Sequence, residues 1–452
     1  MENNQKLLDS LGSKYSGQYL INQFFIRIFT GKTKAEIRSY DYENHSLSEE
    51  DQLWLQGLSF PALYHEHLHY VHEMSTVVGI WGFIYNIIDL SIFCEYVDVP
   101  NSSVFKGIGP PHAELHRKVS NTIRAFNGGM PADLEEIIIT QIISVDETTF
   151  TAFMVDGEEI AKKIPLVVFK YIDRNKRIFE SSLLLNKYYL YEGLAHELDQ
   201  LVEIRKNPQY KSHRVSSEYR VLRLVGHFLN PNIEDRQMLE IASMSLNNWD
   251  CGNWFVRTIT ELKDAGDKSV FMHQLKSAVG KQIAESILEV KFHLSYMKRA
   301  VANRIVISEA VNHMIAIMEQ GLQRRAASPT FEIDVSFSGR FDELNKYVPI
   351  CDYMYVLEDT DTYMKDFLGT HLTPLLSFDL KIFLCFMDYY FTMSSNNEHC
   401  CPLNSCCNFE FRKKNATICV SQPRLAFDLY NPEHDRCPYF FGVAYTRGHN
   451  PK

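Results

Sequence analysis

The chain has 452 residues, of which 45% are hydrophobic, so it is long enough for two or three domains with a large buried core. Its formal net charge is −10 and its pI is near 5.9. This balance, with no long Lys/Arg run, excludes the basic surface that nucleic-acid binding requires. The polar N-terminus lacks the pattern of a secretory signal, so we expect a cytoplasmic protein.

The N-terminal region predicts a β-hairpin followed by two helical segments. Residues 22–41 contain two runs of β-branched and aromatic residues around a turn at residues 30–33. A helix rich in histidine follows at residues 61–75, beginning with a proline. The apolar residues 77–94 are long enough to span a membrane but include an asparagine and an aspartate. We therefore expect a buried helix that continues the histidine segment without a break, and no membrane span.

The middle of the chain predicts a surface region, a second hairpin and a series of helices. Residues 95–130 are rich in Gly and Pro, with one short helical pattern at residues 112–125. A hairpin is predicted at residues 164–180, turning at residues 173–176, and it leads directly into a helical pattern. Residues 217–323 then alternate helical patterns with short polar breaks, which is typical of a helical bundle.

The last part of the chain begins with a break near Ala326, after which the alternating residues suggest a strand. The whole pattern predicts an α+β fold that is mainly helical, with small β-hairpins or a sheet beside an active-site helix pair and a Cys-rich C-terminal region. We expect three domains: a core at 1–216 with an insertion at about 95–160, a helical subdomain at 217–326, and a Cys-rich domain at 327–452.

The helix at residues 61–75 contains the motif H-E-x-x-H, formed by His65, Glu66 and His69. Residues four apart share one face of a helix, so both imidazoles can aim at one point. Imidazole nitrogen is a good zinc ligand, and Glu66 can take a proton from a water held at that point. With 17 histidines in the chain, chance can also produce such a motif, so a third ligand is needed.

Three other polar residues of this helix are not expected to bind metal. His67 and His72 project away from the two motif histidines, so we interpret them as packing or polar residues. Glu73 lies four residues beyond His69, where it could support that histidine. We expect it to face solvent instead.

A third ligand is available in LYEGLAHELD, at residues 190–199. A catalytic zinc ion usually has three protein ligands and one open position. Glu192 stands at the start of this predicted helix, and the small Gly193 and Ala195 would let the helix approach the first one closely. We therefore predict a zinc site formed by His65, His69 and Glu192.

A hairpin, a helix with H-E-x-x-H and a later helix with E-G-x-A together resemble the zinc metallopeptidases of the gluzincin type. The resemblance implies that His65, His69 and Glu192 bind zinc and that Glu66 is the general base. It implies a protein or peptide substrate. It also implies that the two predicted hairpins form a sheet beside the cleft, on which an extended peptide is held as an added strand.

The chain departs from the gluzincin pattern in two places. The separation of His69 from the glutamate ligand is longer than is usual, which requires residues 95–160 to be an insertion. Four residues after that glutamate, these enzymes often place an acid that orients a zinc histidine, whereas this chain has His196. Glu197 or Asp199 would have to take that role. His196 is either structural or a hydrogen-bond donor to a developing oxyanion, which would make it catalytic.

Six of the ten cysteines fall between Cys400 and Cys437. Paired cysteines around a short turn resemble half of a structural zinc site, which Cys401, Cys406, Cys419 and Cys437 would complete. Because the spacing is not a standard one, reactive thiols and ordinary reduced cysteines stay open as alternatives.

The sequence thus predicts a zinc-dependent peptidase, with two alternatives left open. A non-haem di-iron carboxylate enzyme would use Glu66 and His69 as an E-x-x-H motif, which helical di-iron bundles use twice. The second helix argues against it, because Glu192 and His196 are four residues apart. The other alternative is a non-catalytic scaffold with a structural zinc in the Cys-rich region.

Overall fold

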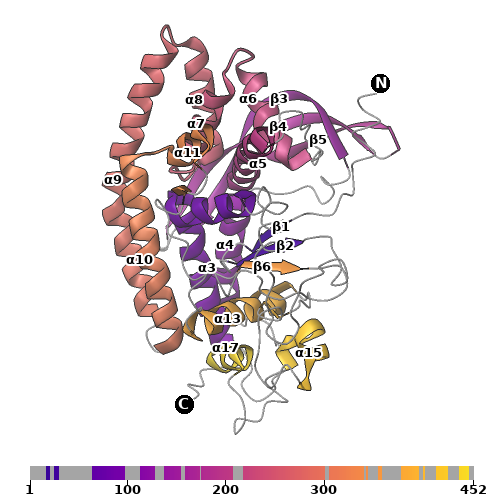
Figure 1. Ribbon diagram of the computed structural model, residues 1–452, viewed down its shortest axis with the longest axis vertical. Coiled ribbons are helices and arrows are strands. Elements are labelled where there is room, and N and C mark those ends of the chain that lie inside the picture. The colour runs from indigo at the N-terminus through magenta and orange to yellow at the C-terminus, as the bar shows by residue number, and fades with distance from the viewer. Residues whose placement is uncertain are drawn as a thin grey trace.

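The computed structural model describes a large part of the chain, in which helices pack beside two small sheets (Figure 1). Most of the described residues are helical, which confirms the predicted α+β, mainly helical class. The described residues are 17–20, 25–29, 64–96, 112–127, 137–153, 158–173, 175–206, 217–300, 305–340, 343–344, 355–358, 378–395, 401–402, 414–425 and 437–446.

The first sheet pairs two strands near the N-terminus with a strand more than 300 residues later in the chain. It has the order β1-β2-β6, formed by β1 (Gly17–Leu20), β2 (Phe25–Phe29) and β6 (Tyr355–Glu358). β1 and β2 are antiparallel, while β2 and β6 are parallel. β1 and β2 both fall before the predicted turn, and they pair with each other on that side of it. The predicted turn at residues 30–33 lies outside the described residues.

The second sheet is antiparallel, in the order β3-β4-β5, formed by β3 (Ile137–Phe153), β4 (Glu159–Asp173) and β5 (Ile178–Leu184). The predicted hairpin is confirmed, because β4 pairs with β5 and the Lys176 N–H donates to the Asp173 carbonyl across the turn (2.9 Å). β3 falls inside the predicted insertion at 95–160 and was missed. Its first residues form an apolar run without alternation, a pattern that does not distinguish a strand from a buried helix.

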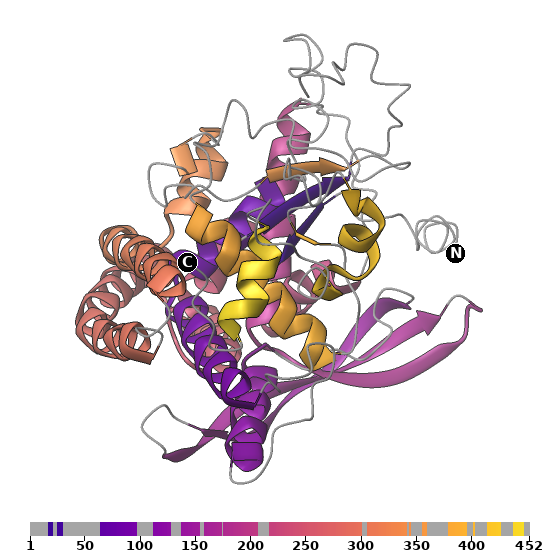
Figure 2. The same cartoon turned by 90° about the horizontal axis from the view of Figure 1, so that it is seen from below.

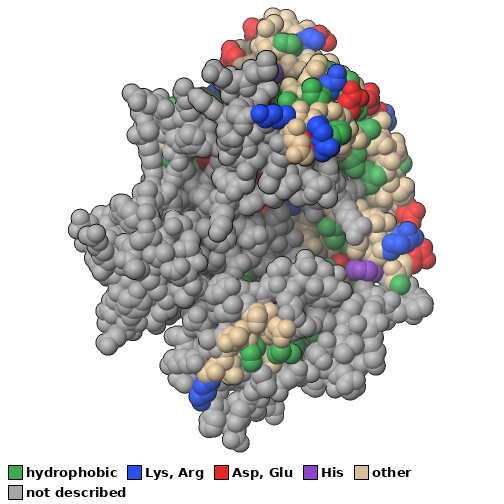
Figure 3. Space-filling model, turned by 90° about the vertical axis from the view of Figure 1, so that its right-hand side faces the viewer, with side chains coloured by type: hydrophobic (Ala, Val, Ile, Leu, Met, Phe, Trp, Pro, Cys, Tyr) green, Lys and Arg blue, Asp and Glu red, His purple; other side chains and the backbone are tan. Residues whose placement is uncertain are grey.

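Exposed ion pairs link neighbouring strands of this sheet. Lys163 on β4 lies 2.6 Å from Glu147 on β3, and Lys170 lies 3.9 Å from Glu180 on β5. On the side of the molecule in Figure 3, acidic and basic side chains of the described residues are intermingled. Such exposed pairs add little stability, but opposite charges suit cross-strand positions.

The predicted helices are largely confirmed, including the short helix in the Gly/Pro-rich region. α9 and α10 form a long antiparallel hairpin along one side of the molecule (Figure 1), and α13 and α17 lie side by side at one end (Figure 2). The helices are α3 (Val77–Tyr96), α4 (His112–Asn127), α5 (Lys187–Lys206), α6 (Ser217–Leu229), α7 (Asp235–Ser245), α8 (Cys251–Asp264), α9 (Lys268–Ala300), α10 (Ile305–Ala327), α11 (Phe331–Ser338), α13 (Phe378–Ser395), α15 (Ala416–Ser421) and α17 (Pro438–Thr446), with a 3-10 helix at Pro423–Leu425.

The strand expected after Ala326 is wrong, because α11 is a helix. The alternating residues F-E-I-D-V-S-F suggested a strand, but Glu332 and Ser336 lie one helical turn apart and are both fully buried. Gly339 ends the helix with φ of 77°. A side chain there would collide with the guanidinium of Arg205, so glycine suits this left-handed position on both counts.

A sharp bend separates the histidine helix, Tyr64–Ser75, from α3, which corrects the expectation of one continuous helix. The two helices meet at 78°. Thr76 Oγ1 accepts the Gly79 N–H (3.1 Å) and so satisfies a donor in the first turn of α3. A side chain on Gly79 would lie 2.4 Å from the Glu73 carbonyl oxygen, so glycine permits the close approach of the two backbones.

The histidine helix lies in the core, since every residue from Tyr64 to Ser75 is buried. Among the described residues, no single helix is long and apolar enough to cross a membrane. The bent pair formed by this helix and Val77–Ile92 passes that test when taken together. The boundaries of the three predicted domains stay predictions.

Candidate metal centre

The histidine helix and α5 bring the three predicted metal ligands together. Glu192 Oε2 lies 3.3 Å from His65 Nε2 and 3.4 Å from His69 Nε2. The ligand atoms of the three residues all lie within 4.8 Å of one another. Within the described ranges, this is the only group of three or more His, Cys, Asp or Glu side chains with such spacing. The predicted triad is therefore a buried group that could bind a metal ion.

The distances of Glu192 from the two histidines suit a small tetrahedral cation. Zinc binds imidazole nitrogen and carboxylate oxygen at about 2.0 to 2.2 Å, so two ligand atoms of a tetrahedral site lie roughly 3.3 to 3.5 Å apart. The two distances from Glu192 Oε2, 3.3 and 3.4 Å, fall in this range. Two imidazoles and one carboxylate suit zinc and several other first-row metals, so the ligand set does not identify the ion.

His65 faces a carboxylate with each of its ring nitrogens. Nδ1 lies 2.9 Å from Asp199 Oδ2, while Nε2 faces Glu192. Burial lowers the pKa of His65, but the hydrogen bonds to Asp199 and Glu192 and the charge of Glu66 outweigh it and raise the pKa to about 10. A neutral imidazole has only one N–H, and here it faces Asp199 at Nδ1. Nε2 can therefore lie against the carboxylate of Glu192 only if Nε2 is also protonated or if a cation lies between the two groups.

Asp199 occupies the position that orients a metal-binding histidine. It lies seven residues after Glu192, which is two helical turns, so both acids lie on the same face of α5. Its side chain is 1% exposed, and its contact with Nδ1 directs the other nitrogen of His65 toward Glu192. Of the two acids considered from the sequence, Glu197 instead pairs with Arg223, at 2.6 and 2.8 Å.

Glu192 is the most accessible of the three ligands. Its side chain is 17% exposed, against 2% for His65 and 7% for His69. Burial favours the neutral acid, but the two histidines hold the pKa of Glu192 well below its usual range. An ionised carboxylate therefore stands at the side of the group that solvent reaches.

The other residues of the H-E-x-x-H segment are buried as well. Glu66 is 7% exposed, and its negative charge acts on His65. Burial lowers the pKa of His67 to about 4, so that imidazole is neutral near pH 7, and it is not a member of the ligand group. This agrees with the prediction that His67 does not bind metal.

His196 lies near the ligand group but contacts it through an aromatic ring. Its imidazole stacks on Tyr219 of α6, with ring centroids 5.0 Å apart. The Tyr219 ring is also perpendicular to the His65 ring, with ring centroids 5.5 Å apart. The catalytic role predicted for His196 stays a prediction.

Tyr219 was missed from the sequence, because its position depends on how α6 is tied to a sheet. Ser217 Oγ donates to the Ile137 carbonyl (2.6 Å) and accepts the Ile139 N–H (3.1 Å). These bonds fix the first turn of α6 to β3, which was also missed. A helical pattern alone does not show which of its residues meets a distant histidine.

The role expected for Gly193 needs correction. A side chain at Gly193 would lie 2.4 Å from the Leu222 side chain, so this glycine lets α5 pack closely against α6. The expected neighbour was the histidine helix. The expectation for Glu73 is also wrong, because Glu73 is fully buried. Burial lowers the pKa of Lys187, while the charge of Glu73 acts in the opposite direction.

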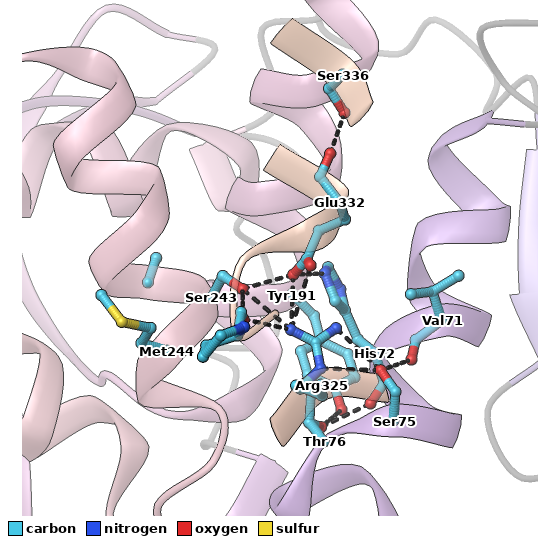
Figure 4. Close-up of polar contacts among 12 residues, drawn as sticks. Val71, His72, Ser75, Thr76, Tyr191, Ser243, Met244, Arg325, Glu332 and Ser336 are labelled. Atoms are coloured by element: carbon cyan, nitrogen blue, oxygen red, sulfur yellow. Dashed lines mark hydrogen bonds and ion pairs between the residues drawn. The ribbon is translucent and has the colours of Figure 1, made fainter. Parts of the chain in front are cut away.

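The far end of the histidine helix is held by a second buried network (Figure 4). His72 Nε2 lies 3.5 Å from Glu332 Oε1 on α11, and the same carboxylate receives Arg325 Nη1 at 3.0 Å. Arg325 also donates to Ser75 Oγ, at 2.9 and 3.0 Å, and to Ser243 Oγ on α7. All these groups are fully buried, so four helices meet around one ion pair.

The aromatic ring of Tyr191 lies between this network and the metal ligands. Its centroid is 5.1 Å from that of His72 and 6.3 Å from that of His69. Its hydroxyl lies 3.2 Å from Thr76 Oγ1, at the bend before α3. The residue next to Glu192 thus packs against the histidine helix from the ligands to the bend.

The predicted cysteine site is described only in part. Cys401, Cys419 and Cys437 are buried, and the Cys401 N–H donates to the Cys419 carbonyl (2.8 Å). In the part of the chain that the structure describes, these thiols do not form a second group with metal-ligand spacing. Cys406 lies outside the described residues. A structural zinc site stays a prediction.

No protein-family model matches the chain, and no curated protein or solved structure is similar to it at a significant level. The resemblance to gluzincins therefore depends on the motif residues alone. The function has to be argued from the geometry of the ligand group.

Proposed function

We propose that the protein is a zinc-dependent peptidase whose ion is held by His65, His69 and Glu192. The observation that carries this proposal is the convergence of the three ligand atoms, with distances of 3.3 and 3.4 Å that suit a tetrahedral ion. Three protein ligands leave the fourth position for water or substrate. Glu66, next to His65 in the chain, has the position of a general base.

Glu66 and Asp199 have distinct roles beside the three ligands. When bound, zinc supplies a Lewis acid that activates water and polarises a carbonyl. Glu66 accepts the proton of the attacking water and returns it to the leaving amine. Asp199 accepts the Nδ1–H of His65 (2.9 Å), which keeps the Nε2 lone pair directed at the ion. Burial excludes water and strengthens these electrostatic effects.

The geometry favours a single ion over a di-iron centre. Di-iron bundles take a glutamate from each of two helices and an E-x-x-H motif from each of two others. Here His65, the residue before Glu66, is itself in the ligand group. On α5, His196 follows Glu192 by four residues and stacks on Tyr219.

A peptide substrate is supported by the motif and by the neighbouring sheet. Tyr219 meets His65 from the start of α6, and Ser217, two residues earlier, is bonded to β3. Among the described strands β3 is an outer strand of its sheet, and because Ser217 already bonds to Ile137 and Ile139, a peptide would pair with β3 beyond Ile139. An extended peptide added to such a strand would run close to the ligand group.

The proposal is tested by comparing metal content and cleavage in matched variants. The parent, Glu66→Gln, His65→Ala and the exposed-site control Glu309→Gln are incubated with a library of peptides derived from whole cells. New amino termini are then identified by mass spectrometry. Glu66→Gln is expected to keep its zinc and lose roughly 10²- to 10⁴-fold in cleavage rate, the usual effect of a general base. His65→Ala should lose both the zinc and the cleavage activity, whereas Glu309→Gln should keep both.

Two outcomes would contradict the proposal in different ways. Cleavage by Glu66→Gln at the parental rate would remove the proposed mechanism. If the parent holds one zinc but produces no new amino termini, the proposed metal centre is supported and the proposed peptidase activity is refuted. A scaffold with zinc only in its Cys-rich region predicts that His65→Ala leaves the zinc content unchanged.

A further inference from the structure

α9 (Lys268–Ala300) has large apolar side chains on its solvent face. Leu288 is 77% exposed, Phe292 64% and Tyr296 50%. They are four residues apart, so they form one continuous row along the helix. The opposite face is buried through residues such as Ile283 and Leu294, and α9 packs against α10 and α3. The row therefore lies on the exposed face of α9, a helix that runs along one side of the molecule (Figure 1).

The other helix of the hairpin shows that this exposure is unusual. The residues of α10 that the structure marks as exposed are polar or small: Glu309, Asn312, His313, Ala316, Gln320, Gln323 and Ala327. α10 thus follows the usual amphipathic pattern, with its apolar side chains facing the core. A row of three large apolar residues on its neighbour is the kind of surface that a partner covers.

The two ends of the row carry opposite charges. Glu285 lies about one turn before Leu288, and its side chain is 70% exposed. Arg299 lies just after Tyr296, and its guanidinium is 5.8 Å from the centre of that ring. Arg299 is exposed as well. The apolar row is therefore flanked by a carboxylate at one end, which lies 3.9 Å from the exposed Lys281, and by a guanidinium at the other end.

We propose that α9 is the interface of a homodimer in which a second copy of the chain packs its α9 antiparallel to the first. A two-fold axis at Phe292 places Leu288 opposite Tyr296 of the other copy and Glu285 opposite Arg299, so the surface is complementary to itself. A parallel arrangement would place equal charges opposite each other. One helix face is a small interface, so the dimer is of the weak class, and it does not depend on the proposed peptidase activity.

The first test is the mass of the protein in solution, measured by sedimentation over about 1 to 100 μM, the range for a small interface. The parent is expected to form a dimer that dissociates on dilution. Phe292→Glu, at the centre of the row, should raise the dissociation constant roughly 30-fold or more, as for other central apolar residues. Val270→Glu is the matched control, because Val270 is 50% exposed on the same helix but far from the row.

The second test examines the antiparallel register by cross-linking. Phe292→Cys should form a disulfide with its own copy, because this residue lies on the axis. Leu288→Cys should not do so alone but should form a mixed disulfide with Tyr296→Cys. The parent protein, oxidised in the same way, corrects for the native cysteines.

The third test uses charge reversal and does not depend on the apolar residues. Glu285→Arg and Arg299→Glu should each weaken the dimer at least about tenfold, because like charges then face each other twice. The variant that carries both Glu285→Arg and Arg299→Glu should dimerise with the parental dissociation constant. Circular dichroism equal to that of the parent confirms that each variant is folded.

The proposal is overturned by any of four results. These are a parent that stays monomeric, a Val270→Glu variant as weakened as Phe292→Glu, no cross-link at residue 292, or a double reversal that fails to recover.

Discussion

His65 and His72 stand two turns apart on one buried helix and each faces a carboxylate, yet their surroundings differ in one respect. Beside His72, the carboxylate of Glu332 is already paired with Arg325, at 3.0 and 3.2 Å. Beside His65, Asp199 and Glu192 face the two ring nitrogens. The positive charge that balances these acids is left to a proton or a metal ion.

The two histidines accordingly have opposite pKa shifts. Burial lowers the pKa of His72 to about 4, and the interaction with Glu332 does not overcome this effect. The two carboxylates and Glu66 do overcome burial at His65 and raise its pKa to about 10. A histidine of this helix is therefore structural at His72, where Arg325 supplies the cation that the carboxylate needs. It is a candidate metal ligand at His65, where the two facing carboxylates have no such cation from the chain.

The largest difference between the two regions is expected in metal binding. His65→Ala and Glu192→Ala should each remove one equivalent of zinc, because two remaining ligands do not hold the ion. His72→Gln should keep that zinc, since the Arg325 network contains no metal ligand in our interpretation. Elemental analysis of protein purified in metal-free buffer measures this. Zinc lost equally from all three variants would mean that the two regions are not distinct.

The next effect concerns stability and is expected at the other region. Arg325→Met leaves the buried Glu332 without its cation, so we expect a loss of about 3 to 5 kcal/mol in the free energy of unfolding. Arg325→Met with Glu332→Leu should recover most of it. Urea unfolding measures both, with Arg257→Met as the control, since its exposed pair with Glu261 is worth less than about 1 kcal/mol. A single change as mild as the control would refute the structural role.

A smaller effect is expected from the residue behind the metal ligand. Asp199→Asn removes the charge that orients His65, so the affinity for zinc should fall roughly 10- to 100-fold without complete loss. Competition with a fluorescent chelator gives the dissociation constant. Glu197→Gln is the matched control, because Glu197 pairs with Arg223. An equal loss in both variants would show that Asp199 has no special part in the site.

A different kind of effect is expected in the pH dependence of the metal-free protein. The pKa of His65 is raised from 6.5 to about 10, so its stabilising contribution is complete below pH 6.5 and is lost as the pH rises toward 10. The pKa of His72 is lowered to about 4, so folding opposes its protonation and stability is lost as the pH falls from 6.5 toward 4.

Unfolding of the chelator-treated parent, His65→Gln and His72→Gln across this range separates the two contributions. The first variant should flatten the alkaline side and the second the acidic side. The same slope in the parent and in His65→Gln above pH 6.5 would contradict the charge assigned to His65. Zinc added to the parent should protect it on the alkaline side, because the ion replaces the proton.

The metal ligands could be predicted from the sequence because both parts of the site are local patterns. His65 and His69 share a helix face by their spacing, and Glu192 stands in a helix with a recognisable motif. Asp199 could be named only as one of two acids, since the choice depends on which of them Arg223 occupies. Tyr219 carries no local signal at all.

The errors at Glu73 and at α11 have a common physical cause. Glu73 was placed in solvent and α11 was taken for a strand because polar residues are usually exposed, while here Lys187 and Arg325 lie in the core beside buried acids. β3 was missed because its first residues lack alternation. Thr76 looks like any helical residue in the sequence, although the chain turns by 78° there.

Helical periodicity and ligand spacing are properties of short segments, so the sequence alone was enough for the mainly helical class and for the three residues that could hold a metal ion. The tertiary structure decided what faces each buried charge, because those contacts join segments separated by tens to hundreds of residues. Such long-range packing places Asp199 behind His65 and Arg325 beside Glu332. It also decides which face of α9, and so which apolar row, stays exposed.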